Sequence, residues 1–98
     1  MFVYVNRRNV RERLLRIVRE AVRNAGLHSG SDKISIKMEN SNGISLIVRD
    51  KGRGFDSSSR LPGSGLETMQ AEAARIGASY QVTSRPGEGT TVEVRIPP

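Results

Sequence analysis

The pattern of apolar residues along this 98-residue chain predicts a long helix near the N-terminus. Apolar side chains recur at three- and four-residue steps from Val10 to Ala25, which is the spacing of one helix face. Asn9 and Glu12 have the spacing of a capping box, so we expect the helix to open there and to run to about residue 28. Gly30 is expected to end this helix.

Strict alternation of apolar and polar residues predicts the strands. Residues 33–39 and 44–48 flank an Asn-Gly turn, residues 80–82 and 92–96 flank a Pro-Gly turn, and residues 2–5 are β-prone. A second helix is expected from Leu66 to Ile76, after a long loop over residues 51–65. The order βαββ, loop, αββ predicts an α+β fold, a two-layer α/β sandwich with a mixed, mostly antiparallel sheet and the helices on one face.

Composition narrows the classes of protein further. The chain has no cysteine and one histidine, which excludes disulfide scaffolds, zinc fingers, thiol nucleophiles and sites built from several histidines. Its length fits one domain over residues 1–98, and no apolar run is long enough to span a bilayer. We expect a cytoplasmic domain whose parent protein, if anchored to a membrane, is anchored through other segments.

The net charge of +6 is concentrated near the N-terminus, where arginines between residues 7 and 23 far outnumber glutamates. Two interpretations stay open: a solvated, Arg-rich helix face, or a surface for an acidic partner such as nucleic acid. The only aromatic residues are two Phe and two Tyr, which disfavours a stacking platform for single-stranded nucleic acid.

Three polar residues, Glu20, Asn24 and His28, follow one another at four-residue intervals along the edge of the apolar stripe. A half-buried row of this kind needs hydrogen-bond partners, or a ligand and its metal. Glu and Asn oxygens suit Mg²⁺, which prefers few protein oxygens together with substrate phosphates, and Glu can also accept a proton from a nucleophile. An ordinary polar helix flank has the same spacing.

The strand over residues 44–48 leads into a carboxylate, Asp50, which has the parity of the apolar side. A carboxylate on the core side needs a donor, and the exocyclic amine of a purine is one. Gly52 and Gly54 permit close approach of the backbone to a ligand. The alternative is a bulged turn with an exposed aspartate.

Two further glycine-rich turns carry candidate residues. Gly63, Gly65 and Leu66 open the second helix, where backbone N–H groups and the helix dipole can hold an anion such as phosphate, although a flexible helix entry looks the same. Thr90 follows a Gly-Glu-Gly turn and shares parity with the apolar residues of the last strand, so its hydroxyl is expected to face the same interior as Asp50. A plain hairpin turn is the alternative.

In this order the four motifs resemble the N, G1, G2 and G3 boxes of the Bergerat-fold ATP-binding superfamily, which includes histidine kinases and type II topoisomerases. The stretches VRDKGRGFD and GSGLETMQAEAARIGASYQVTSRPGEGTTVEVRIP are similar to the catalytic, ATP-binding domain of sensor histidine kinases of the nitrate-sensor and desaturase-sensor type. The resemblance extends from about Leu14 to Ile96. The Walker A, protein-kinase and dinucleotide fingerprints are absent.

The resemblance implies ATP and Mg²⁺ as cofactors. Asn24 would ligate the magnesium, Glu20 would be catalytic by polarising the attacking group, and His28 would line the site. The remaining site residues would bind the nucleotide: Asp50 and Thr90 at the adenine amine, Gly52 and Gly54 at the adenine wall, and Gly63, Gly65 and Leu66 at the phosphates.

The function implied by the resemblance is that of a protein histidine kinase of a two-component signal-transduction system, an ATP-dependent transferase. It would move the γ-phosphoryl group to a histidine on a separate dimerisation domain, so the isolated chain is expected to have little activity. Its partners would be that phosphoacceptor domain of the parent kinase and a response regulator, with a homodimeric parent, no nucleic acid and no membrane contact. The alternatives are an anti-sigma-type serine kinase, or a degenerate module that binds a nucleotide or an acidic partner without turnover.

A larger apolar residue is usual at Gly26, and three further positions depart from that family pattern: Leu27, Gln70 and Glu72 stand where such kinases often carry basic residues. Their substitution removes possible phosphate contacts from the site. Lys51, Arg53 and Arg60 could supply positive charge from the loop instead.

Overall fold

The computed structural model describes residues 7–27, 30–54 and 65–98, which form two helices and a four-stranded sheet. The elements follow the order α1 (Arg7–Leu27), β1 (Ile34–Asn40), β2 (Ile44–Asp50), α2 (Leu66–Arg75), β3 (Ser79–Ser84) and β4 (Thr90–Ile96). The strand expected over residues 2–5 and most of the expected loop lie outside the described residues.

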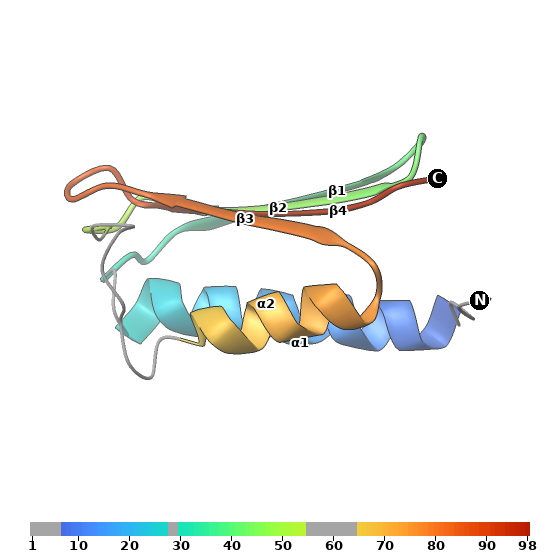
Figure 1. Ribbon diagram of the computed structural model, residues 1–98. Coiled ribbons are helices and arrows are strands. Elements are labelled where there is room, and N and C mark those ends of the chain that lie inside the picture. The colour runs from blue at the N-terminus through green and yellow to red at the C-terminus, as the bar shows by residue number, and fades with distance from the viewer. Residues whose placement is uncertain (1–6, 28–29, 55–64) are drawn as a thin grey trace.

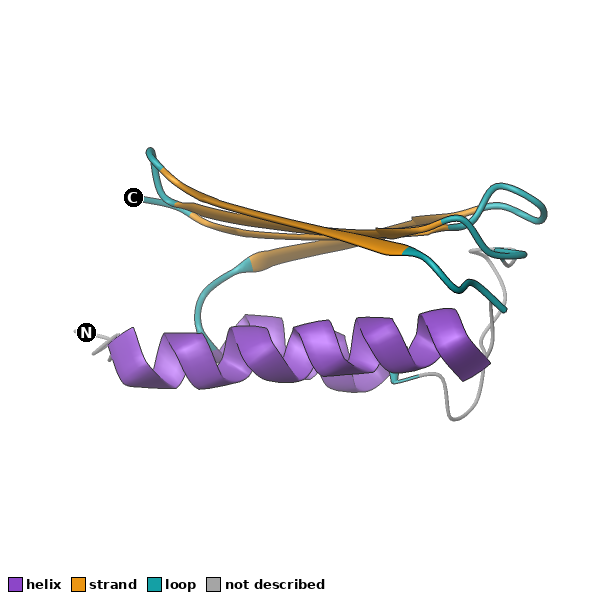
Figure 2. Cartoon of the chain, turned by 180° about the vertical axis from the view of Figure 1, so that it is seen from behind, coloured by secondary structure: helices purple, strands orange, loops and turns teal. Residues whose placement is uncertain are grey.

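The strands are ordered β1-β2-β4-β3, and each neighbouring pair is antiparallel. Both helices lie on one face of the sheet, as Figure 1 and the opposite view in Figure 2 show. The predicted two-layer α+β architecture is therefore confirmed, although the described strands include no parallel pair. Neither helix in this part of the chain is long and apolar enough to cross a membrane.

The core lies between the two layers and draws on both helices and the central strands. The largest fully buried side chains are Ile17 of α1, Met69 of α2, Leu46 of β2 and Val94 of β4. Residues separated by two along a strand share one face, and Leu46 and Val94 are also cross-strand partners. The apolar residues that recur about every 3.6 positions in the helices and every second position in the strands thus pack into one apolar cluster.

The start of α1 differs from the predicted one. The helix begins at Arg7, so Asn9 lies inside it and does not cap it; the capping-box prediction is wrong. The Oδ1 atom of Asn9 instead accepts a hydrogen bond of 3.3 Å from Nε of Arg13, four residues later on the same helix.

Helix α2 ends at Arg75, one residue before the predicted end at Ile76. The N–H of Ala78 donates to the carbonyl of Ala73, and the N–H of Gly77 donates to the carbonyl of Ala74. These two bonds form a Schellman motif, which requires a left-handed residue, and Gly77 has a φ of +66°.

Strand β1 forms one edge of the sheet and is not covered by the helices. Helix α1 lies against β2 and α2 lies against β3, so the inward-facing Ile36 and Met38 of β1 remain 48% and 54% exposed. The alternation of apolar and polar residues predicts β1 correctly, but its apolar side chains would be buried only if a helix covered this strand.

Candidate functional site

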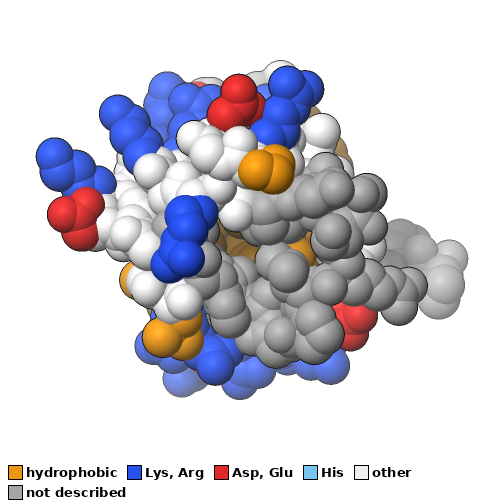
Figure 3. Space-filling model, turned by 90° about the vertical axis from the view of Figure 1, so that its left-hand side faces the viewer, with side chains coloured by type: hydrophobic (Ala, Val, Ile, Leu, Met, Phe, Trp, Pro, Cys, Tyr) orange, Lys and Arg blue, Asp and Glu red, His pale blue; other side chains and the backbone are white. Residues whose placement is uncertain are grey.

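One end of the molecule brings together the ends of several elements. The last turn of α1, the C-terminal ends of β2 and β3, and the first residues of α2 and β4 all lie at the left of Figure 1. Figure 3 looks directly at this end, where basic side chains lie along parts of the margin. Most of the residues that the sequence predicts for a site are therefore neighbours in the fold.

Glu20 and Asn24 are one turn apart on the flank of α1 that faces α2. Both side chains are half-buried, and Oε2 of Glu20 and Oδ1 of Asn24 are buried oxygens without a hydrogen-bond partner among the described residues. Arg23 forms an ion pair with Glu20, but its Nη1 is 3.8 Å from Oε2, too far for a hydrogen bond. Buried acceptors without donors are costly, so this pair calls for a donor or a cation.

Gly65 caps the N-terminus of α2 directly above Glu20. Its φ is +77°, and a Cβ atom at this position would collide with Oε2 of Glu20. The N–H of Met69 makes the first helical bond, to the carbonyl of Gly65, so α2 begins beside Glu20. The G2 resemblance assigns Gly65 and Leu66 to the phosphates, and this assignment stays a prediction.

A row of polar side chains crosses the same end of the sheet. Asp50 of β2 is the cross-strand partner of Thr90 of β4, which is in turn the partner of Ser84 of β3. All three are buried and share the face of Leu46 and Val94, so the predicted inward orientation of Asp50 and Thr90 is correct. The carboxylate Oδ1 of Asp50 accepts a 2.9 Å bond from the N–H of Gly52.

The loop after β2 packs against the turn between β3 and β4. The N–H of Gly87 donates to the carbonyl of Arg53, and Gly54, with a φ of +65°, lies where a Cβ would strike the carbonyl of Arg85. Gly54 therefore allows two backbone segments to touch at this end of the molecule.

Exposed basic residues follow the loops at this end. Lys33 precedes β1, Lys51 and Arg53 follow β2, and Arg85 follows β3. They raise the local positive potential beside Glu20 and Asp50, which favours a polyanionic ligand.

Two predicted site residues, His28 and Gly63, lie outside the described residues, as does Arg60. Two of the departures from the family pattern face solvent, because Leu27 is 64% exposed at the end of α1 and Gln70 is exposed on α2.

The third departure, Glu72, is not a lost phosphate contact. Its side chain is buried between the helices, where Nη1 of Arg13 lies 2.8 Å from Oε2 and Nη1 of Arg16 lies 3.6 Å from Oε1. Burial alone would raise the pKa of Glu72, but the hydrogen bond and the charges of Arg13 and Arg16 outweigh it and lower the pKa. Glu72 joins α2 to α1, a role that sequence reasoning missed.

Sequence reasoning also missed Ser84 and Tyr80. Ser84 is 3% exposed and shares the parity of Tyr80 and Val82, a signal that was available in the sequence. The hydroxyl of Tyr80 donates to the carbonyl of Leu66 over 3.4 Å and so links β3 to the first turn of α2. Burial raises the pKa of Tyr80 to about 12.

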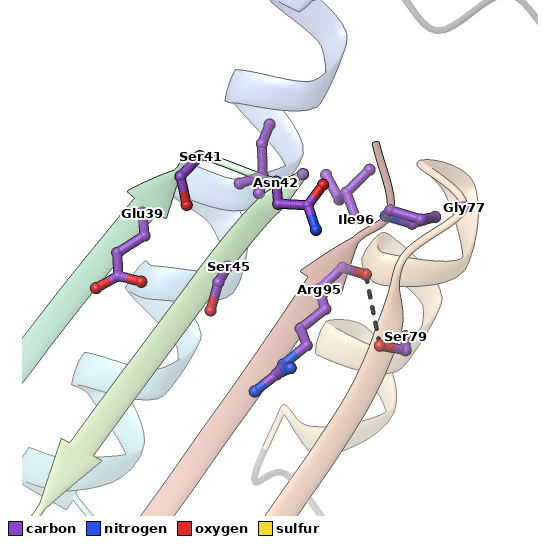
Figure 4. Close-up of a pocket in the computed structure, with 11 residues that line it drawn as sticks. Glu39, Ser41, Asn42, Ser45, Gly77, Ser79, Arg95 and Ile96 are labelled. Atoms are coloured by element: carbon purple, nitrogen blue, oxygen red, sulfur yellow. Dashed lines mark hydrogen bonds between the residues drawn. The ribbon is translucent and has the colours of Figure 1, made fainter.

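A separate hollow of about 650 Å³ lies at the opposite end of the sheet. It opens beside the β1–β2 turn and the outer face, with Ser45, Ser79 and Arg95 among its lining residues (Figure 4). Ile44 and Ile96 pair at that end, whereas Asp50 and Thr90 pair at the other, so the hollow does not belong to the candidate site.

Sensor proteins are among the curated relatives of this chain. The sensor protein VraS of Staphylococcus aureus is 34% identical over 92 residues, which cover 92% of this chain and 26% of VraS. VraS of Staphylococcus epidermidis is 33% identical over the same share of each chain. The chain thus spans about a quarter of the length of these relatives.

Solved structures agree with the fold. The histidine kinase domain of the blue-light activated kinase of Erythrobacter litoralis EL346 has a TM-score of 0.73 and 26% identity, covering 91% of this chain and 45% of that domain. AdeS, a histidine kinase of Acinetobacter baumannii, has a TM-score of 0.72 and 22% identity over 89% of this chain and 46% of its own; it supports the fold alone. The model of the histidine kinase-, DNA gyrase B- and HSP90-like ATPases matches residues 9–98, and the chain belongs to that family.

Proposed function

We propose that this chain binds ATP with Mg²⁺ at the end of the sandwich where α1, α2 and the sheet meet. The observation that carries the proposal is the pair of buried oxygens, Oε2 of Glu20 and Oδ1 of Asn24, which have no donor among the described residues. A ligand that brings a cation would remove the free-energy cost of burying these oxygens without partners. The adjoining N-terminus of α2 and the basic loops suit a triphosphate.

The residues fit a magnesium ion, because amide and carboxylate oxygens are the hard ligands that Mg²⁺ takes alongside phosphates. Asn24 would hold the ion and Glu20 lies one turn away on the same flank. When bound, the ion would neutralise part of the negative charge on the phosphate oxygens.

Asp50 and Thr90 would receive the adenine ring at the sheet end, and Gly52 and Gly54 would form its wall. The first turn of α2, from Gly65, would hold phosphate oxygens through N–H groups. These contacts would position the nucleotide with its γ-phosphoryl group near Glu20, and positioning contributes much of the catalysis in phosphoryl transfer.

The proposed reaction is transfer of the γ-phosphoryl group to a histidine of a separate dimerisation domain. An imidazole nitrogen forms the new N–P bond while the bond from phosphorus to the bridging oxygen breaks, and ADP leaves. The other ring nitrogen loses its proton, and the carboxylate of Glu20 would polarise or accept that N–H. His28 lies outside the described residues, and its site-lining role stays a prediction.

The parent protein would be a cytoplasmic-facing, homodimeric sensor kinase that passes its phosphoryl group to a response regulator. The relatives that cover this chain are sensor proteins, which supports this assignment over an anti-sigma-type serine kinase.

Substitution Asp50→Asn tests the adenine contact. Replacing one acceptor oxygen by an amide N–H should weaken binding of a fluorescent ATP analogue by at least about tenfold, measured by titration with magnesium present. The matched control is Asp32→Asn, an exposed carboxylate on the loop before β1 that should leave the dissociation constant unchanged. An Asp50→Asn protein that binds like the parent would contradict the adenine site.

The reaction class is tested with labelled ATP and two added substrates, a kinase dimerisation domain and an anti-sigma antagonist. Acid-labile phosphate on the dimerisation domain is the expected product. Acid-stable phosphate on the antagonist would favour the serine kinase, and binding without transfer to either would favour a module without turnover.

A further inference from the structure

Helices α1 and α2 lie side by side on one face of the sheet and run in opposite directions (Figure 1). Two contacts between side chains and backbone mark the seam where they meet. Nη1 of Arg13 lies 2.8 Å from Oε2 of Glu72, and the carboxylate of Glu20 lies against Gly65, where a Cβ atom would collide with it. The second contact belongs to the candidate site, whereas the first does not.

The two contacts are equally spaced on both helices. Arg13 and Glu20 are seven residues apart on α1, and Gly65 and Glu72 are seven residues apart on α2. Seven residues make about two turns, or roughly 10 Å, so both positions of each helix lie on the same face. The contact that Glu72 makes with Arg13 therefore determines which residue of α2 stands opposite Glu20.

The ion pair is more directional than the apolar contacts around it. Glu72 is 6% exposed and meets two arginines of α1, Arg13 and, at 3.6 Å, Arg16. Nε of Arg13 also donates to Oδ1 of Asn9, which holds the guanidinium from its own helix. Apolar packing keeps the helices together but has no preferred direction. Displacement of α2 along α1 would separate a buried carboxylate from its counter-charge, which is costly.

We infer that Arg13 and Glu72 are positioning residues for phosphoryl transfer, because their ion pair fixes α2 along α1 with Gly65 beside the carboxylate of Glu20. The inference rests on the proposed role of Glu20 at the phosphoryl group. The ion pair is about two helical turns from Gly65, so its effect must pass through the position of α2. Displacement by one residue is about 1.5 Å, and a misplacement of about 1 Å can lower a rate about a hundredfold.

The position of α2 is measured directly with two spin labels. The chain has no cysteine, so Arg19→Cys on α1 and Ala74→Cys on α2, both at exposed positions, provide the attachment sites. Pulsed electron resonance should give one narrow distribution of distances between the labels in the parent. Addition of Glu72→Ala should displace that distribution by about 1.5 Å or more, or broaden it clearly. The measurement needs neither ATP nor magnesium.

Val94→Ala is the matched control for the distance. Val94 is buried on β4, outside the seam between the helices, so its truncation should destabilise the fold but leave the distance between the labels unchanged. Glu72→Gln keeps the size of the side chain and removes its charge. It serves if Glu72→Ala does not fold, and it should change the distribution in the same direction.

Phosphotransfer to an added dimerisation domain is the second readout. At saturating ATP and per folded molecule, Glu72→Ala should lower the rate by at least about tenfold, and Val94→Ala should leave it unchanged. If Glu72 acts through the contact of Gly65 with Glu20, the losses in Glu72→Ala and Gly65→Ala should not multiply. The double variant should then be little slower than the slower single variant, whereas independent effects at positions about 10 Å apart would multiply.

The distance and the rate must change together. A folded Glu72→Ala protein, or Glu72→Gln in its place, that changes only one of them or neither overturns the positioning role. Losses that multiply in the double variant, or an equal loss of rate in Val94→Ala, assign the ion pair to stability alone and overturn it too. A parent chain that transfers no phosphoryl group to the dimerisation domain overturns the proposed function, and the inference with it.

Discussion

At the scale of single residues, the candidate site contains polar atoms and space that other described side chains do not use. Glu20 and Asn24 keep oxygens without hydrogen-bond donors among the described residues, and Gly65 keeps the space that a methyl group would take from the Glu20 carboxylate. Each of these features costs folding free energy by itself and becomes favourable when a ligand supplies the missing partner.

Gly65→Ala should damage function more than stability. A β-carbon at positive φ costs about 1–2 kcal/mol, and the same cost applies to Gly77→Ala, where φ is +66° and nothing lies near the new atom. At Gly65 the methyl group meets the end of a flexible side chain, so Glu20 should swing aside and adopt a new position. Chemical denaturation should give similar losses for both variants, while phosphotransfer to an added dimerisation domain should fall only in Gly65→Ala. Equal activity of the two variants would show that the position of Glu20 is unimportant.

At the scale of elements, the two helices are held antiparallel by contacts at two levels. Glu72 pairs with Arg13 and Arg16, and further along the same interface Gly65 touches Glu20. The ion pair therefore sets the position of α2 along α1 as well as adding to stability. Tyr80 adds a third tie, from β3 to the carbonyl of Leu66.

Glu72→Gln should lower the free energy of unfolding by about 2–3 kcal/mol at neutral pH, because it leaves Arg13 without its buried counter-charge. Gln70→Ala, on the exposed side of α2, should change stability by less than about 0.5 kcal/mol. The comparison is made by urea denaturation at several pH values.

The pH dependence follows from the lowered pKa of Glu72. A carboxyl whose pKa is lower in the folded state gives its full stabilisation above its unfolded value of 4.5 and loses it as the pH falls through the folded value. The difference between the parent and Glu72→Gln should therefore shrink below about pH 4.5. A difference that persists unchanged into strong acid would contradict the ion-pair explanation.

At the scale of the whole molecule, positive charge occurs on two different surfaces. Arg11 and Arg19 are exposed on α1, whereas Lys51, Arg53 and Arg85 are exposed on loops at the site end. The positive net charge of +6 therefore does not by itself indicate nucleic acid, because part of it lies where a triphosphate would bind.

Arg53→Gln should weaken ATP binding several-fold, and the double substitution Arg11→Gln/Arg19→Gln should leave it unchanged. A charge near the phosphates contributes to affinity, whereas charges on the far surface are screened beyond about 10 Å at 0.1 M salt. Both variants are titrated with ATP and with a DNA duplex at two salt concentrations. Tight, steeply salt-dependent DNA binding that disappears in the α1 variant, together with no ATP binding, would favour the acidic-partner module instead.

The sequence alone predicted the parts of this protein that follow from local periodicity and from motif order. The apolar repeats specify α1 and α2, alternation specifies the strands, and parity correctly orients Asp50 and Thr90 toward the helices. Motif order identified the family, because the chemistry of four short segments is readable without their positions in space.

Only the tertiary structure decided which residues meet across elements. The sequence suggests that Glu72 is a departure at a phosphate site, but in the structure it pairs with Arg13. The alternation of Ile36 and Met38 predicts a strand, but the edge position of β1 leaves both side chains exposed. Ser84 is buried, and its hydroxyl meets that of Thr90 on the neighbouring strand. The physical reason is common to all three: periodicity reports which way a side chain points along its own element, whereas its partners depend on how the helices and strands are packed together.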